Sequence, residues 1–189
     1  MSKQPKIALI TGGSRGIGAA TARVLAAQGY YLCINYRGNH DAAAELQQEL
    51  LQVTEKVVIK QADIAIEAQV VELFEFIDRE LGTITALVNN AGILRLQCRL
   101  QDLTAERINQ ILQTNVTGSF ICAREAVKRM STALGGQGGA IVNVSSAASY
   151  TGAPREYVDY AASKGAMDSM TKCRSLEVAA EGIRVNSVR

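Results

Sequence analysis

Residues 6–18, KIALITGGSRGIG, decide the fold of this chain. The run Lys6–Thr11 is apolar and rich in β-branched residues, as in a buried strand, and a glycine-rich turn follows it directly. An alanine-rich helical pattern then extends over Ile17–Gln28, with Gly29 beyond it, where glycine commonly ends a helix. The stretch therefore predicts a strand, a tight turn and a helix, which is the opening unit of an α/β fold.

Short apolar runs continue to alternate with helical patterns along the chain. Further strands are predicted at Tyr30–Tyr36, Lys56–Lys60, Thr85–Asn89, Ala140–Ser145 and Ile183–Val188. Further helices are predicted at Asp41–Gln52, Glu67–Leu81, Thr104–Gln113, Val116–Ala133 and Tyr157–Ala180, with a slight break near Asn115. The strands are apolar throughout, which indicates a parallel sheet covered by helices on both faces. The sequence thus predicts one doubly wound α/β domain over residues 1–189.

Two local signals support individual helices. In the helix predicted over Glu67–Leu81, apolar side chains recur at helical spacing, which predicts one buried face; they are Val70, Leu73, Phe74 and Ile77. Thr104 stands where a helix N-cap is expected, ahead of Arg107.

Composition excludes several classes of protein. The 189 residues are 48% hydrophobic and 20% charged, unlike a disordered chain, and no apolar run approaches a membrane span. A net charge of +2 gives no argument for a nucleic-acid or membrane partner. The single histidine, His40, argues against a multi-histidine zinc site, so no metal is expected. Reduced thiols and a cytoplasmic location are expected from four widely spaced cysteines, Cys33, Cys98, Cys122 and Cys173.

The glycine turn predicts a phosphate site. Gly12, Gly16 and Gly18 follow the spacing Gly-x-x-x-Gly-x-Gly, and glycines let the backbone approach a ligand closely. The helix N-terminus that follows presents free N–H groups to an anion. A turn without any ligand is the alternative, and the place of this turn after the first strand of a doubly wound sheet weakens that alternative. No Gly-Lys-Ser/Thr follows, which excludes an ATP-binding P-loop.

The end of the second predicted strand distinguishes two dinucleotides. An NAD site needs an acidic residue there for the ribose 2′-hydroxyl, but the chain reads Asn35-Tyr36-Arg37. Arg37, together with Arg15 from the turn, is suited to a 2′-phosphate. Two solvated arginines are the alternative. NADP(H) is therefore expected in preference to NAD(H).

Tyr160 and Lys164 lie four residues apart on one predicted helix face. A tyrosine with a pKa near 10 must shift by roughly 3 units, about 4 kcal/mol, to exchange protons at neutral pH. An ammonium at ~5 Å in an effective dielectric of ~20 supplies roughly 3 kcal/mol. A surface pair is the alternative, because this spacing is frequent in helices. Tyr157 lacks such a partner, since Ala161 stands four residues after it.

Together these segments resemble the short-chain dehydrogenase/reductase family. The resemblance covers essentially the whole chain, because the family's motifs occur in the family's order. They are Thr11–Gly18, Asp63 after the third strand, Asn89–Gly92 after the fourth, Asn115, the serine strand Val142–Ser146, Tyr160 with Lys164, and Arg184–Asn186.

The resemblance implies four catalytic roles. Tyr160 would donate a proton to the carbonyl in reduction, or act as the base in oxidation. Ser146 would polarise the substrate oxygen. Lys164 would tune Tyr160 and hold the nicotinamide ribose, and Asn115 would order a water that relays protons to Lys164. Ser146 is preferred over Ser145 because the second serine usually matches the catalytic place, and strand alternation lets only one of the two face the site.

The resemblance also implies the cofactor contacts. Asp63 and Ile64 would lie against adenine, and the segment from Asn90 to Gly92 would line the ribose. The full expected set is Gly12, Ser14, Arg15, Gly16, Ile17, Gly18, Tyr36, Arg37, Asp63, Ile64, Asn90, Ala91, Gly92, Tyr160 and Lys164.

The expected activity is NADP(H)-dependent hydride transfer between the nicotinamide and a small carbonyl or alcohol. The chain resembles the branch with 3-oxoacyl-carrier-protein reductases and bacterial glucose dehydrogenase-like enzymes, but a fold does not name a substrate. Lys128 and Arg129 would suit an acidic carrier protein, although solvated charges are the favoured interpretation. A cofactor-binding sensor or scaffold without catalysis is the alternative function.

Two further expectations concern the C-terminal part and assembly. Family members continue past Arg-Val-Asn with a Pro-Gly, a substrate-covering loop and helix, and a seventh strand. The sequence ends at Arg189 before any of these, so six of seven strands are expected and the C-terminal substrate-loop region is expected to be missing from it. Either the native chain stops there, or the sequence is the N-terminal part of a longer protein. A homo-oligomer, a tetramer or otherwise a dimer, is expected through apolar stripes formed by Val116, Phe120, Ala123, Val127, Met130, Met167 and Met170.

Overall fold

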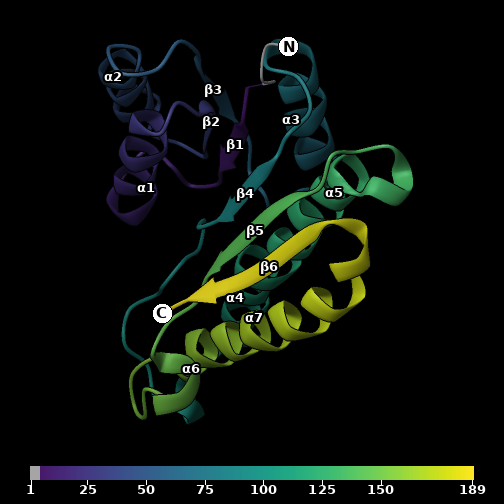
Figure 1. The fold of residues 1–189 in the computed structure, drawn as a ribbon. Coiled ribbons are helices and arrows are strands. Elements are labelled where there is room, and N and C mark those ends of the chain that lie inside the picture. The colour runs from purple at the N-terminus through teal and green to yellow at the C-terminus, as the bar shows by residue number, and fades with distance from the viewer. Residues whose placement is uncertain (1–4) are drawn as a thin grey trace.

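The sheet contains six strands that all run parallel, in the order β3-β2-β1-β4-β5-β6 (Figure 1). This computed structural model describes residues 5–189. The strands are β1 Ile7–Ile10, β2 Tyr31–Tyr36, β3 Val57–Gln61, β4 Ala86–Asn89, β5 Gly139–Val144 and β6 Ile183–Val188. Each lies within two residues of its predicted position, and the predicted doubly wound fold is confirmed.

Helices connect the strands and lie on both faces of the sheet (Figure 1). They are α1 Gly16–Ala27, α2 His40–Leu50, α3 Glu67–Glu80, α4 Ala105–Leu112, α5 Ser119–Met130, α6 Ala148–Thr151 and α7 Val158–Glu177, with short 3₁₀ turns η1 Leu100–Asp102, η3 Thr132–Leu134 and η4 Ala179–Glu181. The sequence did not predict α6. It extended the last helix to Ala180, whereas α7 ends at Glu177 and η4 leads to Gly182, whose φ of 75° reverses the chain.

Alternate residues of β1 pack into two separate apolar layers. Ile7 and Leu9 join the cluster formed with α3 and α5, while Ala8 and Ile10 join the cluster formed with α1 and α2. The strand is therefore apolar at every position because both of its faces are buried. The predicted apolar face of α3 is buried as expected, at Val70, Leu73, Phe74 and Ile77.

The helical layer formed by α1 and α2 covers less of the sheet than the layer on the opposite face. In the part of the chain that the structure describes, α1 and α2 pack on β1, β2 and β3. No described helix lies in front of β5 and β6 in the view of Figure 1. The opposite layer extends further across the sheet, because α5 packs on β4 and β5 and α7 packs on β6.

A π-helical segment, η2 (Gln113–Gly118), replaces the break predicted near Asn115 and joins α4 to α5. The wider π turn keeps the helix continuous while it buries Thr114 and Asn115. Gly118 makes this packing possible, since a Cβ on it would lie 2.7 Å from the carbonyl oxygen of Ile64. The predicted cap is present as well, because the Thr104 hydroxyl accepts from the Arg107 N–H at 3.2 Å.

The same substitution at two helical glycines is expected to change stability in opposite directions. Gly118→Ala places a methyl group against fixed backbone and lowers the free energy of unfolding by about 1–3 kcal/mol. Gly165→Ala, in α7, meets nothing within 4 Å and raises it by about 0.5–1 kcal/mol through helix propensity. Urea denaturation of both variants measures the difference, and equal effects at the two positions would contradict the close packing of η2 on Ile64.

Candidate functional site

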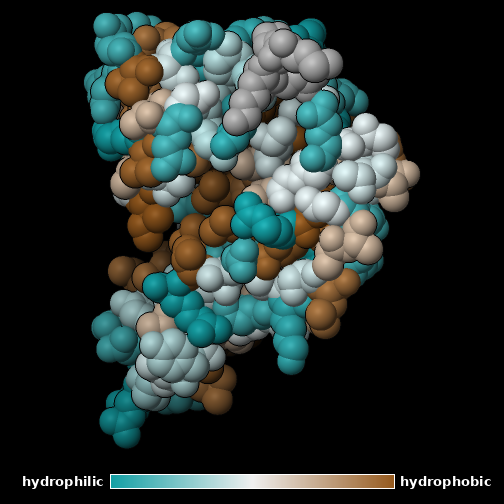
Figure 2. Space-filling model, viewed as in Figure 1, coloured by the Kyte–Doolittle hydropathy of each residue, from teal (hydrophilic) through white to brown (hydrophobic). Residues whose placement is uncertain are grey.

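A cleft of about 760 Å³ lies at the carboxyl ends of β1 to β4. Figure 2 shows the surface indented between the N-terminal helices and the part that carries α6, with hydrophobic side chains at the indentation. The cleft brings together most of the predicted cofactor residues, namely Gly12, Ser14, Arg15, Gly16, Ile17, Tyr36, Arg37, Asp63, Ile64, Asn90, Ala91 and Gly92. Sequence reasoning did not name six further lining residues, Asn35, Gly38, Asn39, Ala62, Ile93 and Thr114.

The glycine turn lies directly against the end of β4. Gly12 has a φ of +59°, and a Cβ on it would lie 2.9 Å from the Cα of Ala91. The Thr11 hydroxyl accepts from the N–H groups of Asn90 and Ala91, each at 3.1 Å. Asn90 Nδ2 donates to the carbonyl oxygens of Thr11 and Gly12 at 2.9 and 3.0 Å. A side chain larger than hydrogen at Gly12 would therefore displace the floor of the cleft.

Gly18 does not line the cleft, in contrast to Gly12 and Gly16. A Cβ on it would lie 2.6 Å from Asn90 Nδ2 and 2.8 Å from the carbonyl oxygen of Gly12. It packs the first turn of α1 against Asn90, and its predicted contact with a cofactor stays a prediction.

The N-terminus of α1 is suited to an anion. Its N-cap residue, Arg15, makes no side-chain cap, and the first turn contains no acidic residue. The N–H groups of this turn thus keep their hydrogen-bonding capacity and the positive end of the helix dipole. Together with the close-fitting glycine turn, this arrangement fits the pyrophosphate of a dinucleotide.

The buried side chain of Asn35 holds the glycine turn through a hydrogen bond with Gly12. Its Oδ1 accepts from the Gly12 N–H at 3.2 Å, and its Nδ2 donates to the carbonyl oxygen of Ala62 at 2.9 Å. A polar residue at the end of an otherwise apolar strand was the signal in the sequence that could have identified it.

Charged and polar groups surround the far end of the cleft. Arg37 Nε lies 3.4 Å from the Asp63 carboxylate, and the Arg37 side chain is 67% exposed. The Tyr36 hydroxyl lies 2.6 Å from His40 Nδ1. Arg15 is exposed and lines the same cleft. The two predicted arginines thus border the same cleft, and one of them pairs with the carboxylate of Asp63.

Lys164 and Tyr160 lie together next to the part of the cleft that Gly92 lines. Lys164 Nζ is 5.5 Å from the centre of the Tyr160 ring and donates to the carbonyl oxygen of Val144 at 2.6 Å. Burial lowers the pKa of Lys164 to about 8, although the nearby Asp168 carboxylate acts in the opposite direction. A Cβ on Gly92 would lie 3.7 Å from Lys164 Nζ, so the lysine adjoins a residue that lines the cleft.

Asn115 links this pair to the end of β4. Its Oδ1 accepts from the Ile93 N–H at 2.7 Å, and its Nδ2 donates to Ile93 O at 3.0 Å and to Ser163 Oγ at 3.1 Å. Ser163 in turn donates to the carbonyl oxygen of Tyr160 at 2.7 Å. The Asn115 side chain thus connects the two segments that carry Gly92 and Tyr160, and its Oδ1 uses one of the two lone pairs of an amide oxygen in doing so.

The two serines after β5 have different surroundings. Ser145 is buried and donates to the carbonyl oxygen of Lys164 at 3.3 Å. Ser146 is half-buried, and its hydroxyl accepts from the Ala148 N–H at 3.2 Å. Within residues 5–189, the Ser146 hydroxyl makes no hydrogen bond to Tyr160. Ser145 thus donates its hydroxyl proton to α7, whereas the Ser146 hydroxyl, among these residues, only accepts and can still donate to a substrate.

Metal ligands and membrane spans are not found among the described residues. No group of three His, Cys, Asp or Glu side chains in residues 5–189 is placed to hold a metal ion. None of the helices there has the length and apolar character needed to cross a membrane.

Comparison with known proteins agrees with this geometry. Residues 6–189 match the family model described as short chain dehydrogenase. The chain is 61% identical over 183 residues to "Uncharacterized oxidoreductase YgfF" of Escherichia coli, which covers 97% of this chain and 74% of that protein. It is 34% identical over 186 residues to the 3-oxoacyl-[acyl-carrier-protein] reductase FabG of Staphylococcus aureus, covering 98% and 74%.

In a third relative, the match covers a smaller share of the relative's own length. "General stress protein 39" of Bacillus subtilis is 33% identical over 183 residues, and the match covers 97% of this chain but 62% of that protein. The extent of the family match, with the parallel sheet and the glycine-lined cleft, leads to one conclusion: the chain belongs to the short-chain dehydrogenase family and is an oxidoreductase.

Proposed function

We propose that the protein interconverts a small carbonyl compound and the corresponding alcohol, with NADP(H) as cofactor and Tyr160 as the acid and base. One observation carries the proposal: a buried lysine lies beside Tyr160 and adjoins the cleft that contains the uncapped N-terminus of α1. Residues 1–189 act as one dinucleotide-binding domain in this proposal.

The chain's own residues would manage the proton and the substrate oxygen. A bound nicotinamide supplies or accepts the hydride. Tyr160 donates its hydroxyl proton to the carbonyl oxygen in reduction and withdraws a proton from the alcohol in oxidation. Ser146 donates a hydrogen bond to the same oxygen, which is consistent with its half-buried hydroxyl. Lys164, when protonated, favours the ionised form of Tyr160, and Asn115 orders the water that returns protons to Lys164.

The preference for NADP(H) is supported by the cations at the far end of the cleft. Arg15 and Arg37 border it, and no acidic residue ends β2, where a ribose 2′-hydroxyl would need one. Arg37 exchanges its contact with Asp63 for the 2′-phosphate when the cofactor binds. That contact is long, at 3.4 Å, and its arginine is exposed, so the exchange costs little.

A free small substrate is proposed rather than one attached to a carrier protein. The relative named for 3-oxoacyl-carrier-protein reduction raises the second possibility. However, Lys128 lies 2.8 Å from the buried Glu125 carboxylate, and Arg129 bonds both Glu125 and Asp78, at 3.1 and 2.7 Å. These two cations are therefore already neutralised within α5 and α3.

A cytoplasmic homo-oligomer, a tetramer or a dimer, completes the proposal. Phe120 on α5 is 45% exposed, and the Arg174 guanidinium on α7 stacks over its ring at 5.2 Å. Arg174 Nη1 is buried without a hydrogen-bond partner, and Leu176 is 76% exposed. Of the other proposed interface residues, Ala123, Met130, Met167 and Met170 are buried within the chain. The cytoplasmic location is supported by the four cysteines, which are all free thiols.

Tyr160→Phe in the full protein is expected to lower kcat by about 10²- to 10⁴-fold, because the proton donor is lost. The affinity for NADPH stays nearly unchanged. Tyr157→Phe is the matched control and keeps wild-type turnover, since that tyrosine has no lysine one turn away. NADPH oxidation across a panel of ketones and aldehydes measures both. Near-normal turnover by Tyr160→Phe would falsify the proposed mechanism.

Lys164→Met is expected to gain stability over the wild type at pH 7 and to lose that advantage as the pH rises. The pKa of Lys164 in the folded protein, about 8, lies below the usual lysine value of 10.5. The buried ammonium therefore destabilises the native state below pH 8, and this cost disappears toward pH 10.5. The advantage declines by about 3 kcal/mol over that range. Urea denaturation of the cofactor-free protein measures it. Lys172→Met, exposed on the same helix, is the control, and a parallel decline there would contradict the assignment.

Arg37→Gln is expected to weaken NADPH binding by about 10- to 100-fold, the value of a charged hydrogen bond, and to leave NADH binding nearly unchanged. Fluorescence titration with the two cofactors measures the ratio. Arg23→Gln removes an exposed arginine of α1 that pairs with Glu49 and serves as the control. An equal loss of affinity for both cofactors would contradict 2′-phosphate recognition by Arg37.

A further inference from the structure

An ion pair outside the family's motifs holds the first turn of α7, which carries Tyr160. Arg107 Nε on α4 donates to Asp159 Oδ2 at 2.7 Å. The side chains are 18% and 2% exposed, respectively. Because Asp159 immediately precedes Tyr160, this contact joins α4 to the turn from which the tyrosine projects.

Both oxygens of the Asp159 carboxylate are used. Oδ2 accepts from Arg107, while Oδ1 accepts from the backbone N–H of Tyr160 at 2.9 Å. On the other side, the Thr104 hydroxyl accepts from the Arg107 N–H, so the start of α4 has a defined position too. The carboxylate is thus a direct bridge between the guanidinium and the backbone of Tyr160.

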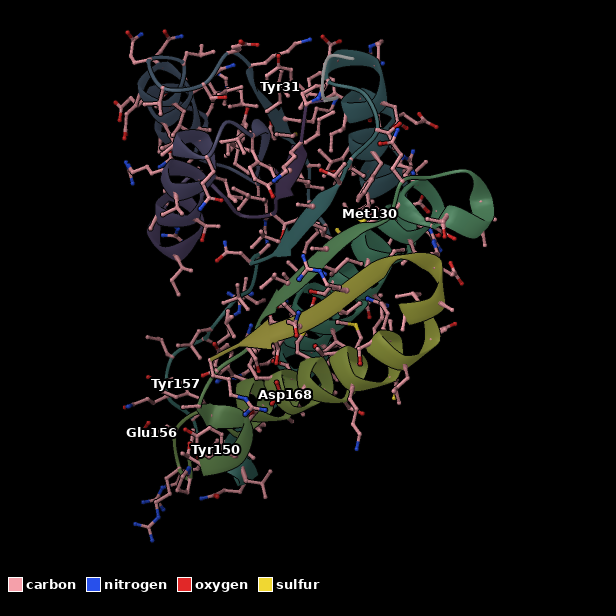
Figure 3. The ribbon with its side chains drawn as sticks, viewed as in Figure 1. Tyr31, Met130, Tyr150, Glu156, Tyr157 and Asp168 are labelled. Carbon is pink, nitrogen blue, oxygen red and sulfur yellow. The ribbon has the colours of Figure 1, made fainter. Side chains whose placement is uncertain are left out.

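The backbone that leads into α7 needs such a constraint. Ala153 and Arg155 have φ values of 41° and 66°, a left-handed conformation that costs free energy for residues other than glycine. Figure 3 shows Glu156 and Tyr157 beside Tyr150 at this end of the molecule. The Glu156 carbonyl oxygen accepts from the Cys98 N–H at 3.0 Å. Tertiary contacts therefore hold this path against its local preference.

Stability alone does not account for the pair. Burial by itself would raise the pKa of Asp159. The hydrogen bonds from Arg107 and from the backbone N–H of Tyr160, together with the charge of Arg107, outweigh it, so that the pKa lies below its usual range. Arg107 Nη2 is nevertheless buried without a hydrogen-bond partner. A buried ion pair with an unsatisfied donor is often no more stable than apolar residues of the same volume.

We propose that Arg107 and Asp159 are positioning residues for Tyr160. Their contact fixes the first turn of α7 against α4 and thereby sets the place of the Tyr160 hydroxyl relative to Lys164 and the substrate oxygen. This inference rests on the proposed function, in which Tyr160 exchanges the proton.

The test compares Arg107→Met, Asp159→Asn and the double variant in the full protein. Each single variant is expected to lower kcat by about 10- to 100-fold, the cost of a reacting group misplaced by about 1 Å, with NADPH affinity nearly unchanged. The double variant leaves no unpaired charge, so its melting temperature exceeds those of the singles while its kcat stays low. Arg107→Lys, which keeps the charge, recovers part of the lost turnover.

Hydrogen exchange of the cofactor-free protein gives a readout independent of activity. The backbone N–H groups of residues 160–164 are expected to exchange faster in both single variants and in the double variant. Arg23→Met, which breaks the exposed pair with Glu49, is the matched control and changes neither exchange in α7 nor kcat.

Two outcomes would overturn the inference. The first is a wild-type kcat in the single variants. The second is a wild-type kcat in the double variant, because the ion pair would then only neutralise two buried charges and would not position Tyr160. If a single variant does not fold, the double variant and Arg107→Lys decide. Tyr160→Phe in the same assay separates the two proposals: its inactivity beside active ion-pair variants defeats only the positioning role, while its activity defeats the proposed function.

Discussion

The close approach of two chain segments at the carboxyl edge of the sheet determines where the site lies. β1 and β4 are neighbours, and the chain leaves their ends toward opposite layers. The turn after β1 and the segment after β4 must therefore share one small volume, in which Gly12 lies against Ala91 without room for a side chain. Thr11 and Asn90 satisfy the polar groups of both segments with each other. The cleft opens where the two segments diverge, as is usual at the switch point of such sheets.

Buried amides extend this order to the chemical end of the site. Asn89 donates to Asn143 at 3.0 Å, and Asn143 donates to the Thr171 hydroxyl of α7 at 2.8 Å. Asn115, placed by the π turn, joins Ile93 after β4 to Ser163 on α7. Each of these hydrogen bonds offsets part of the cost of burying an amide, so together they favour a defined position of α7 against the sheet. The nucleotide cleft and the Tyr160–Lys164 pair therefore share one polar framework.

The strands and the apolar face of α3 could be predicted because each follows from residues close together in the sequence. The glycine turn was singled out by the same kind of local pattern, whereas Asp63, Ile64 and the segment from Asn90 to Gly92, which also line the cleft, were expected only from the family resemblance. The π turn could not, since apolar spacing does not distinguish π from α hydrogen bonding around Asn115. The packing of Gly18 against Asn90 could not be predicted either, because Asn90 comes much later in the chain, after β4. Arg107 and Asp159 lie 52 residues apart, and neither belongs to a motif. The left-handed backbone at Ala153 and Arg155 carries no glycine to reveal it.

The strand order also bears on how the chain folds while it emerges from the ribosome. β1, β2 and β3 pair with one another from residues 7–61, so half of the sheet can assemble before the rest is synthesised. β4 must then dock on the free edge of β1, after which β5 and β6 each add to the strand made before it. Until β4 arrives, the nascent protein exposes one apolar edge at β1, where intermolecular pairing would compete with folding.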